Sequence, residues 1–317
     1  MNMMERTQRY MDEIIEVLKG KSPKEVLSYA IVNEEEEARY YRQLERHARR
    51  GSVKILFRQM AEESDEHRDN LYKLFKKLYP DEEPASVEAP PVEVAPFYPE
   101  FETAEDYLEA LEYCMKSELF AKETYELLAQ KATDDESRAI FARLAEMEED
   151  HYRRIKKVYD LLMSFKARKL LPENLEPGGY LVQDKTKGRY IFADLIERGS
   201  GTVISRDPPK ILTRWFGMTN LNVVWLSNTT VKGAMNAREL VESRDLIAKV
   251  LERGEVLLLE NVEYIALSEG FKRLMEYLSF LRDVAITSGS HMIVHAGREA
   301  FDTKEWAVLR AEFEEVD

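Results

Sequence analysis

An internal repeat constrains the fold of this chain more than any other feature of its sequence. One offset of 84 residues superimposes two stretches, across two predicted helices and the turn between them, without a gap. The identities that coincide are Tyr29 with Tyr113, Glu34 with Glu118, Tyr41 with Tyr125, Leu44 with Leu128, Phe57 with Phe141, Ala61 with Ala145, Glu62 with Glu146 and His67 with His151. Helical periodicity alone repeats the polar pattern but not the residue identities. The sequence therefore predicts a duplicated helical hairpin.

Four long amphipathic segments make up this first half of the chain. They span residues 22–50, 51–79, 103–132 and 134–165, with apolar residues every three or four positions. Prolines in the connection between the second and third segments exclude a helix there. A connection of this length suits a crossover between two antiparallel pairs, so the segments predict an all-α four-helix bundle. A shorter amphipathic helix is expected at about residues 4–19.

The character of the sequence changes after a segment rich in proline and glycine, Lys169–Tyr180. Short apolar and β-branched runs follow, with helical segments between them: GYLV, GTVIS, NVVWL, EVLLLENV and HMIVH. This alternation is typical of an α/β domain with a mostly parallel sheet. We therefore predict a bundle domain at residues 1–168, a linker at 169–177 and an α/β domain at 178–317.

Composition excludes several classes of protein. The chain has 46 Lys and Arg against 60 Asp and Glu, and this net charge of −14 disfavours a nucleic-acid partner. Its single cysteine, Cys114, excludes an intramolecular disulfide and a rubredoxin-type CxxC iron site. The sequence has no apolar run long enough for a membrane helix and no signal-peptide core, which favours a cytoplasmic protein without a membrane partner.

The repeat indicates that the stretch LAEMEEDHYRRI contains candidate metal ligands. Glu148 and His151 are three residues apart, so they share one helix face. A carboxylate-bridged metal site in a four-helix bundle takes one glutamate from each of two helices and a Glu-x-x-His pair from each of the others. Glu34 and Glu118 are the candidate single glutamates, and His67 is the counterpart of His151. For a Glu-x-x-His pair without such a repeat, an exposed helix face would be the better interpretation.

The first copy of the repeat departs from this pattern, because Ser64 stands where the second copy has Glu148. Three carboxylates then face two ferrous ions, which carry four positive charges. Glu37, one turn after Glu34, is the candidate fourth carboxylate, and we expect it beside Glu34 on the His67 side. Glu63 is rotated by about 100° around the helix and is a poorer substitute. Two metals, one metal and no metal all remain open at this point.

The tracts AIVNEEEEARYYRQL, CMKSELFAKETYELL and FARLAEMEEDH resemble the rubrerythrin branch of ferritin-like proteins over about residues 20–165. The resemblance implies bound iron, with His67 and His151 as terminal neutral imidazoles, Glu148 bridging, and Glu34 and Glu118 completing the ligands. It also implies a reaction with peroxide or oxygen, of peroxidase or ferroxidase type, in a homodimer. An external electron donor would be required. The position of the family's additional glutamate is Ala121 here, so the chain departs from the family's pattern at that ligand.

Residues 178–315 resemble an archaeal domain of unknown function that is found attached to sensor modules. The features that carry the resemblance are TVISRDPPKIL, VLLLENVEYIALSEGF and MIVHAGREAF. It implies a nucleotide-free P-loop-like fold used in regulation or partner binding, because neither GxxxxGK[ST] nor GxGxxG is present. We interpret Glu260 as the polar end of a strand. A non-enzymatic iron or redox sensor and a metal-free scaffold are the alternatives to an enzyme.

Overall fold

The computed structural model describes residues 12–89, 100–168, 174–196, 200–218, 221–229, 231 and 233–316. The chain divides into two compact units. The first contains the residues up to Ala48 together with Leu56–Asp160, and the second contains Arg49–Ile55 and the residues from Leu161 onward. Residues 12–18 form part of the predicted first helix, whereas residues 4–11 of that helix and 169–173 of the predicted linker lie outside the described residues.

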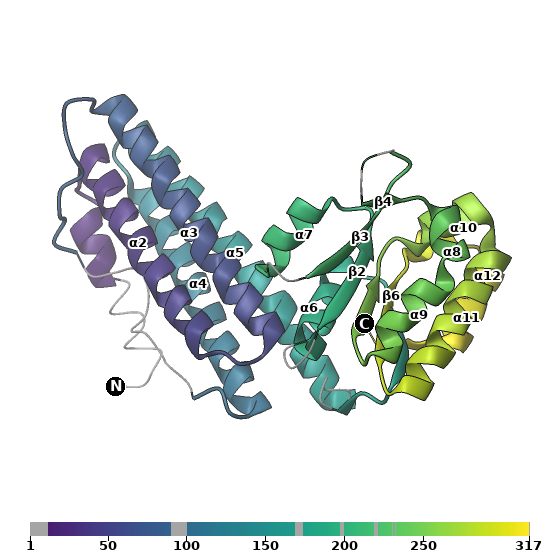
Figure 1. The fold of residues 1–317 in the computed structure, drawn as a ribbon. Helices are drawn as coiled ribbons and strands as arrows, with labels where there is room; N and C mark the ends of the chain where they lie inside the picture. Colours follow the sequence, from purple (N-terminus) through teal and green to yellow (C-terminus); the bar gives the residue numbers. More distant parts are fainter. Residues whose placement is uncertain are drawn as a thin grey trace. The chain divides into compact units, whose positions relative to one another are not determined.

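The first unit is built from four long helices that run side by side (Figure 1). They are α2 (Pro23–His47), α3 (Gly51–Leu78), α4 (Ala104–Lys131) and α5 (Asp135–Arg168). The offset of 84 residues carries the end of α2 onto the end of α4, and the start of α3 onto the start of α5. The capping residues Ala48 and Ala132 also share one extended conformation, with φ and ψ of −63° and 134° in the first and −61° and 134° in the second. The duplication is therefore structural.

Local chemistry explains where the first helix of each pair begins. Ser22 accepts a hydrogen bond from the backbone amide of Glu25, and the Glu25 carboxylate accepts one from the amide of Ser22. Thr103 and Asp106 form the same reciprocal pair at the start of α4. Each arrangement satisfies amides that have no partner within the helix. Both caps thus position a helix that contributes carboxylates to the centre of the bundle.

The second unit contains a sheet of seven parallel strands in the order β4-β3-β2-β5-β6-β1-β7. The strands are β1 (Gly178–Val182), β2 (Gly201–Ser205), β3 (Asn222–Leu226), β4 (Ala234–Met235), β5 (Val256–Leu259), β6 (His291–His295) and β7 (Glu314–Glu315). The five predicted strands are confirmed. The two-residue strands β4 and β7 were not predicted, since they are too short to produce an alternating pattern.

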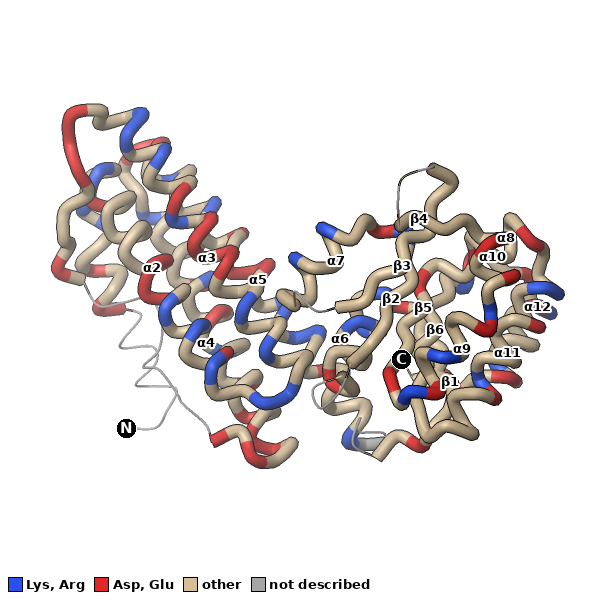
Figure 2. The backbone as a smooth tube through the Cα atoms, viewed as in Figure 1, with Lys and Arg blue, Asp and Glu red and all other residues tan. Residues whose placement is uncertain are grey.

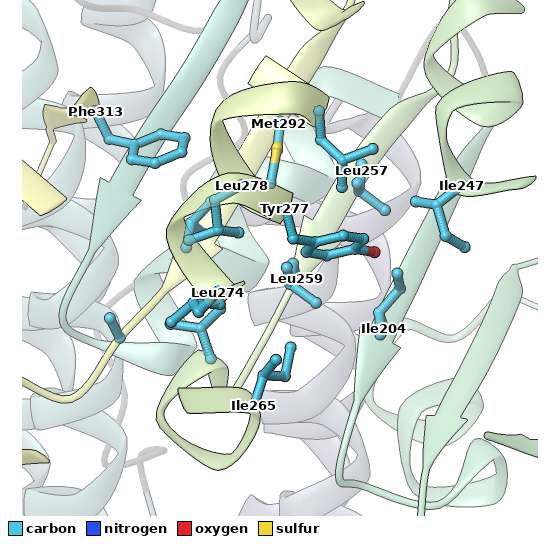
Figure 3. Packing of buried hydrophobic residues seen from close by; sticks show 14 of the residues in the cluster. Ile204, Ile247, Leu257, Leu259, Ile265, Leu274, Tyr277, Leu278, Met292 and Phe313 are labelled. Carbon is cyan, nitrogen blue, oxygen red and sulfur yellow. The ribbon is translucent and has the colours of Figure 1, made fainter. Parts of the chain in front are cut away.

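Helices cover both faces of this sheet (Figure 1). The helices are α6 (Lys185–Leu195), α7 (Pro209–Phe216), α8 (Ala237–Glu242), α9 (Arg244–Glu252), α10 (Val262–Glu269), α11 (Phe271–Ser288) and α12 (Thr303–Glu312), with a short 3₁₀ turn at Arg298–Ala300. Alternate strand residues such as Leu257, Leu259 and Met292 pack with Tyr277 and Leu278 of α11 (Figure 3). This alternation buries one sheet face under α8–α12.

The opposite face of the sheet lies against α6. A Cβ atom added at Gly188 would lie 2.8 Å from Cγ2 of Val182, with side-chain atoms of Leu258 and Ile293 at 3.9 and 3.8 Å. Glycine therefore permits the close approach of α6 to the neighbouring strands β5, β6 and β1. This approach places the first turns of α6 near the carboxyl ends of the strands. Outside the cores, acidic and basic residues are interspersed on both units (Figure 2).

Candidate metal centre

Four buried side chains meet inside the bundle. Glu37 of α2, Glu118 of α4, and Glu148 and His151 of α5 each offer a ligand atom, and these atoms all lie within 4.8 Å of one another. The Nδ1 atom of His151 lies 3.1 Å from Oε1 of Glu37, 3.6 Å from Oε2 of Glu118 and 4.0 Å from Oε2 of Glu148. Three helices thus direct carboxylates at one imidazole nitrogen.

The other two predicted ligands lie next to this group. Oε2 of Glu34 is 3.5 Å from Nδ1 of His67, and the His67 and His151 rings stack with centroids 5.3 Å apart. The His67 side chain is 23% exposed, whereas that of His151 is 1% exposed. All six residues predicted from the sequence therefore lie in one region, and His67 forms its solvent-facing edge.

The environment of Ser64 explains how Glu37 enters the centre. Ser64 is completely buried, and its hydroxyl donates a hydrogen bond to the backbone carbonyl oxygen of Met60 at 2.9 Å. Because this side chain is short, the Glu37 carboxylate can lie beside it and reach His151. Glu37 also interacts with Glu34. Glu37 was expected beside Glu34 on the His67 side; the structure places it next to Glu34 and 3.1 Å from Nδ1 of His151.

Further polar groups surround these side chains. The Tyr41 hydroxyl donates a hydrogen bond to the Glu118 carboxylate, which fixes one of its oxygens. On the other side of the His151 ring, Nε2 lies 3.9 Å from Oε2 of Glu63, and Oε1 of Glu63 is paired with Arg154 at 2.5 Å. The sequence analysis identified the Tyr41 aromatic position but not the Glu63–Arg154 pair. Only the position of Glu63 next to Ser64 in the sequence could have indicated it.

Burial and mutual repulsion control the protonation of the carboxylates. The pKa values of Glu34 and Glu148 are raised well above their ordinary range, first by burial and next by the nearby Glu37. Burial likewise raises the pKa of Glu37. Burial opposes the ionisation of Glu118 too, but hydrogen bonds from His151 and Tyr41 outweigh it and lower the pKa of this carboxyl group. Without a cation, the centre therefore retains protons on some of its carboxyl groups.

The two imidazoles differ in protonation. Burial acts to lower the pKa of His151, but the Glu37 and Glu118 carboxylates outweigh it and raise the pKa well above the ordinary value. The pKa of His67 is lowered to about 4, mainly by burial and then by the charge of His151. His67 is therefore neutral at pH 7 and presents a lone pair. A bound cation would replace the proton on His151.

The chemistry of these residues fits a metal ion. Oε2 of Glu34, Nδ1 of His67 and Nε2 of His151 are buried and have no hydrogen-bond partner among the described residues. Leaving polar atoms buried in this way costs free energy unless another group binds them. A cation that accepted the lone pairs of the Glu34 oxygen and the His67 nitrogen would remove that cost at these two atoms, and carboxylate and imidazole ligands suit iron. The residues present thus fit the iron centre implied by the resemblance.

A second charged cluster, partly buried, lies in the α/β unit at the carboxyl ends of β2 and β5. Glu260 is completely buried and accepts hydrogen bonds from Nε and Nη2 of Arg189 at 2.6 and 2.9 Å. Asp207 pairs with Arg189 and, at 2.8 Å, with Lys185. Glu260 was interpreted as the polar end of a strand; it does follow β5, but it is paired and inaccessible. Sequence alone did not show that Arg189 is its partner.

The bundle and its six ligand candidates, five of them buried and His67 at the solvent edge, define a ferritin-like protein with a centre suited to binding iron. Residues 25–159 match the rubrerythrin family, and residues 181–313 match the protein of unknown function DUF835. The chain therefore joins a rubrerythrin domain to a DUF835 domain, which confirms both resemblances.

Other comparisons add little to this assignment. One solved structure, described as hypothetical protein Pfu-1136390-001 from Pyrococcus furiosus, is 27% identical to the chain. The match covers 48% of this chain and 96% of that one, with a TM-score of 0.40. No curated protein matches the chain. Among the described residues, no helix is both long enough and apolar enough to cross a membrane.

Proposed function

We propose that the bundle binds iron and reacts with peroxide or oxygen, as a peroxidase or ferroxidase, and that the α/β domain regulates it. Glu34, Glu37, His67, Glu118, Glu148 and His151 would be the metal ligands. The observation that carries this proposal is the pair of buried atoms on Glu34 and His67 that lack a hydrogen-bond partner in the described part of the chain, next to the buried side chains of Glu37, Glu118, Glu148 and His151. Four carboxylates also match the charge of two ferrous ions.

Bound iron would supply Lewis acidity and an electron-transfer centre. Neighbouring residues contact the side chains that would bind the iron. Tyr41 holds one oxygen of Glu118, and the Glu63–Arg154 pair lies against the far side of the His151 ring. The Tyr41 hydrogen bond restricts the orientation of Glu118, as partners behind metal ligands generally do. The partial exposure of His67 provides the side from which a small molecule approaches.

A peroxidase reaction requires reducing equivalents. Converting hydrogen peroxide to two water molecules consumes two electrons and two protons. Glu34 and Glu148, whose raised pKa values favour the protonated form, are suited to hold protons close to the centre. The chain has a single cysteine, so we propose an external electron donor in place of a rubredoxin domain.

The second candidate function is iron or redox sensing without turnover. The observation that favours it is Ser64, which replaces a glutamate of the repeat and makes the two halves of the centre unequal. In the α/β unit, the charges at the carboxyl ends of β2 and β5 are already paired. Such a domain would transmit a signal by contacting a partner, with no reaction of its own.

Metal analysis followed by a turnover assay tests the proposal. Full-length protein purified without chelator should contain iron, and His151→Ala should lose most of it. The matched control is Glu146→Gln, a change at an exposed position of the same helix, which should retain the wild-type content. Peroxide consumption with an artificial electron donor, lost in His151→Ala, would support the enzyme, and its absence in iron-loaded wild type would favour the sensor. Protein without iron that cannot be loaded would contradict both.

A further inference from the structure

The two copies of the repeat differ in how their carboxylates are distributed over the two helices of each copy. In the second copy, Glu118 lies on α4 and Glu148 on α5, and the position one turn after Glu118 is Ala121. In the first copy, both carboxylates, Glu34 and Glu37, lie on α2, and the α3 position is a serine. The carboxylate missing from α3 is thus restored one turn along α2. Each copy still supplies two carboxylates and one histidine.

This relocation makes the two halves of the centre unequal. Glu37 lies with the carboxylates of the second copy and 3.1 Å from His151, so three carboxylates and one buried imidazole form a single compact group. The remaining pair, Glu34 and His67, is 3.5 Å apart and includes the more exposed imidazole. A symmetric arrangement would give each half two carboxylates.

From this asymmetry we infer two metal positions of different affinity, an inference that rests on the proposed function. The inner position is formed by Glu37, Glu118, Glu148 and His151, and it binds its ion more tightly. The outer position is formed by Glu34 and His67 at the solvent edge, and it exchanges ferrous ions with the surroundings. Coulombic attraction favours this order, because three carboxylates in a low-dielectric pocket attract a divalent cation more strongly than one does.

A cobalt titration of the full-length protein tests the inference, with Co²⁺ as a spectroscopic substitute for ferrous iron. Metal-depleted wild type should bind two equivalents in two steps that differ by at least about tenfold in dissociation constant, the usual scale for losing part of a ligand environment. His67→Gln and Glu34→Gln should each abolish the weak step and retain the tight equivalent. The exposed change Glu146→Gln should alter neither step. Circular dichroism melts would verify that each variant is folded.

A double variant provides the sharper test. Glu37→Ala combined with Ser64→Glu gives the first copy the glutamate, alanine, glutamate, histidine pattern of the second. The two steps should then merge to within a few-fold, while Glu37→Ala alone should weaken the tight step. Two equal steps in wild type, or loss of the tight step in His67→Gln, would overturn the inference and leave iron binding intact. No cobalt or iron binding at all would overturn the proposed function as well.

Discussion

The buried carboxylates carry the largest free-energy cost of burial among the residues of the metal centre. Glu34, Glu37, Glu118 and Glu148 are between 3% and 7% exposed, where an unpaired charge is expensive. Without metal, the bundle limits this cost by protonation, since the pKa values of Glu34 and Glu148 are well above their ordinary range. A cation removes the cost more completely, but it must displace those protons first.

Metal should therefore stabilise the protein in a pH-dependent way. Raising the pH favours loss of the carboxyl protons, so metal affinity should increase from pH 6 to pH 8. A metal at one hundred times its dissociation constant adds about 2.7 kcal/mol to the free energy of unfolding. We expect Co²⁺ to raise the melting temperature of chelator-treated protein, and to raise it more at pH 8. Calorimetric melts at the two pH values check this, and a melting temperature independent of metal would contradict it.

Tyr41 offers a test of a single hydrogen bond in the centre. Tyr41→Phe removes the donor to Glu118 and leaves a buried carboxylate with one partner fewer, at a cost of about 1–3 kcal/mol in unfolding free energy. Metal affinity should fall with it, since the orientation of Glu118 is no longer fixed. The matched control is Tyr72→Phe, which removes an exposed hydrogen bond to Glu83 and should cost less than about 0.5 kcal/mol. Equal effects from denaturant unfolding of both variants would argue against a special role for Tyr41.

At the scale of elements, the sequence was sufficient where local rules act. The repeat, the amphipathic periodicity and the prolines predicted the four long helices, and the apolar runs predicted five of the strands. The sequence was insufficient for contacts between residues that are far apart in the chain. Glu37 reaching His151 depends on the space that Ser64 leaves, and the Arg189–Glu260 pair joins residues 71 positions apart. Spacing indicated that Glu37 shares a helix face with Glu34, but it did not encode that Glu37 would contact His151 or that Arg189 would pair with Glu260.

The start of α2 gives a prediction at this scale. Ser22→Ala removes the side-chain acceptor for the Glu25 amide and disrupts the reciprocal cap. The expected loss is about 0.5–2 kcal/mol of unfolding free energy. Since α2 carries Glu34 and Glu37, metal should partly restore the melting temperature of this variant. Ser22→Asp, which retains a cap acceptor, is the control and should remain near wild type in thermal melts. A destabilised Ser22→Asp would show that capping is not the cause.

At the scale of the whole molecule, the two domains differ in their buried charged groups. Within the residues that the structure describes, the bundle has buried ligand atoms without hydrogen-bond partners, whereas the charged groups at the strand ends of the α/β domain are paired with one another. In open parallel sheets, ligands bind at the carboxyl ends of the strands where the strand order changes direction. Here that point lies between β2 and β5, because β3 continues the sheet on one side and β6 on the other. Lys185 and Arg189 meet Asp207 and Glu260 there, so two cations are matched by two anions.

These contacts predict that the α/β domain does not bind nucleotides. Phosphates are usually held by free backbone amides at a helix N-terminus, but the side chain of Asp184 already accepts a hydrogen bond from the Lys187 amide at the start of α6. The Arg189 guanidinium is likewise held by Glu260 and Asp207. Calorimetry with magnesium ATP and with NAD should detect no binding up to millimolar concentrations. Micromolar binding that Arg189→Ala abolished would contradict this prediction.

We expect the charged cluster around Arg189 and Glu260 to stabilise the α/β domain. A single and a double variant test whether the ion pair is responsible. Arg189→Ala leaves Glu260 buried without its main partner, which should cost about 3–5 kcal/mol in unfolding free energy. Replacing both residues, as Arg189→Met with Glu260→Leu, removes the uncompensated charge and should cost much less than Arg189→Ala alone. Denaturant unfolding of both variants checks this. If the double variant is as unstable as the single one, the packing of the Arg189 side chain near Trp215, where its guanidinium lies 5.3 Å from the ring centroid, matters more than the ion pair.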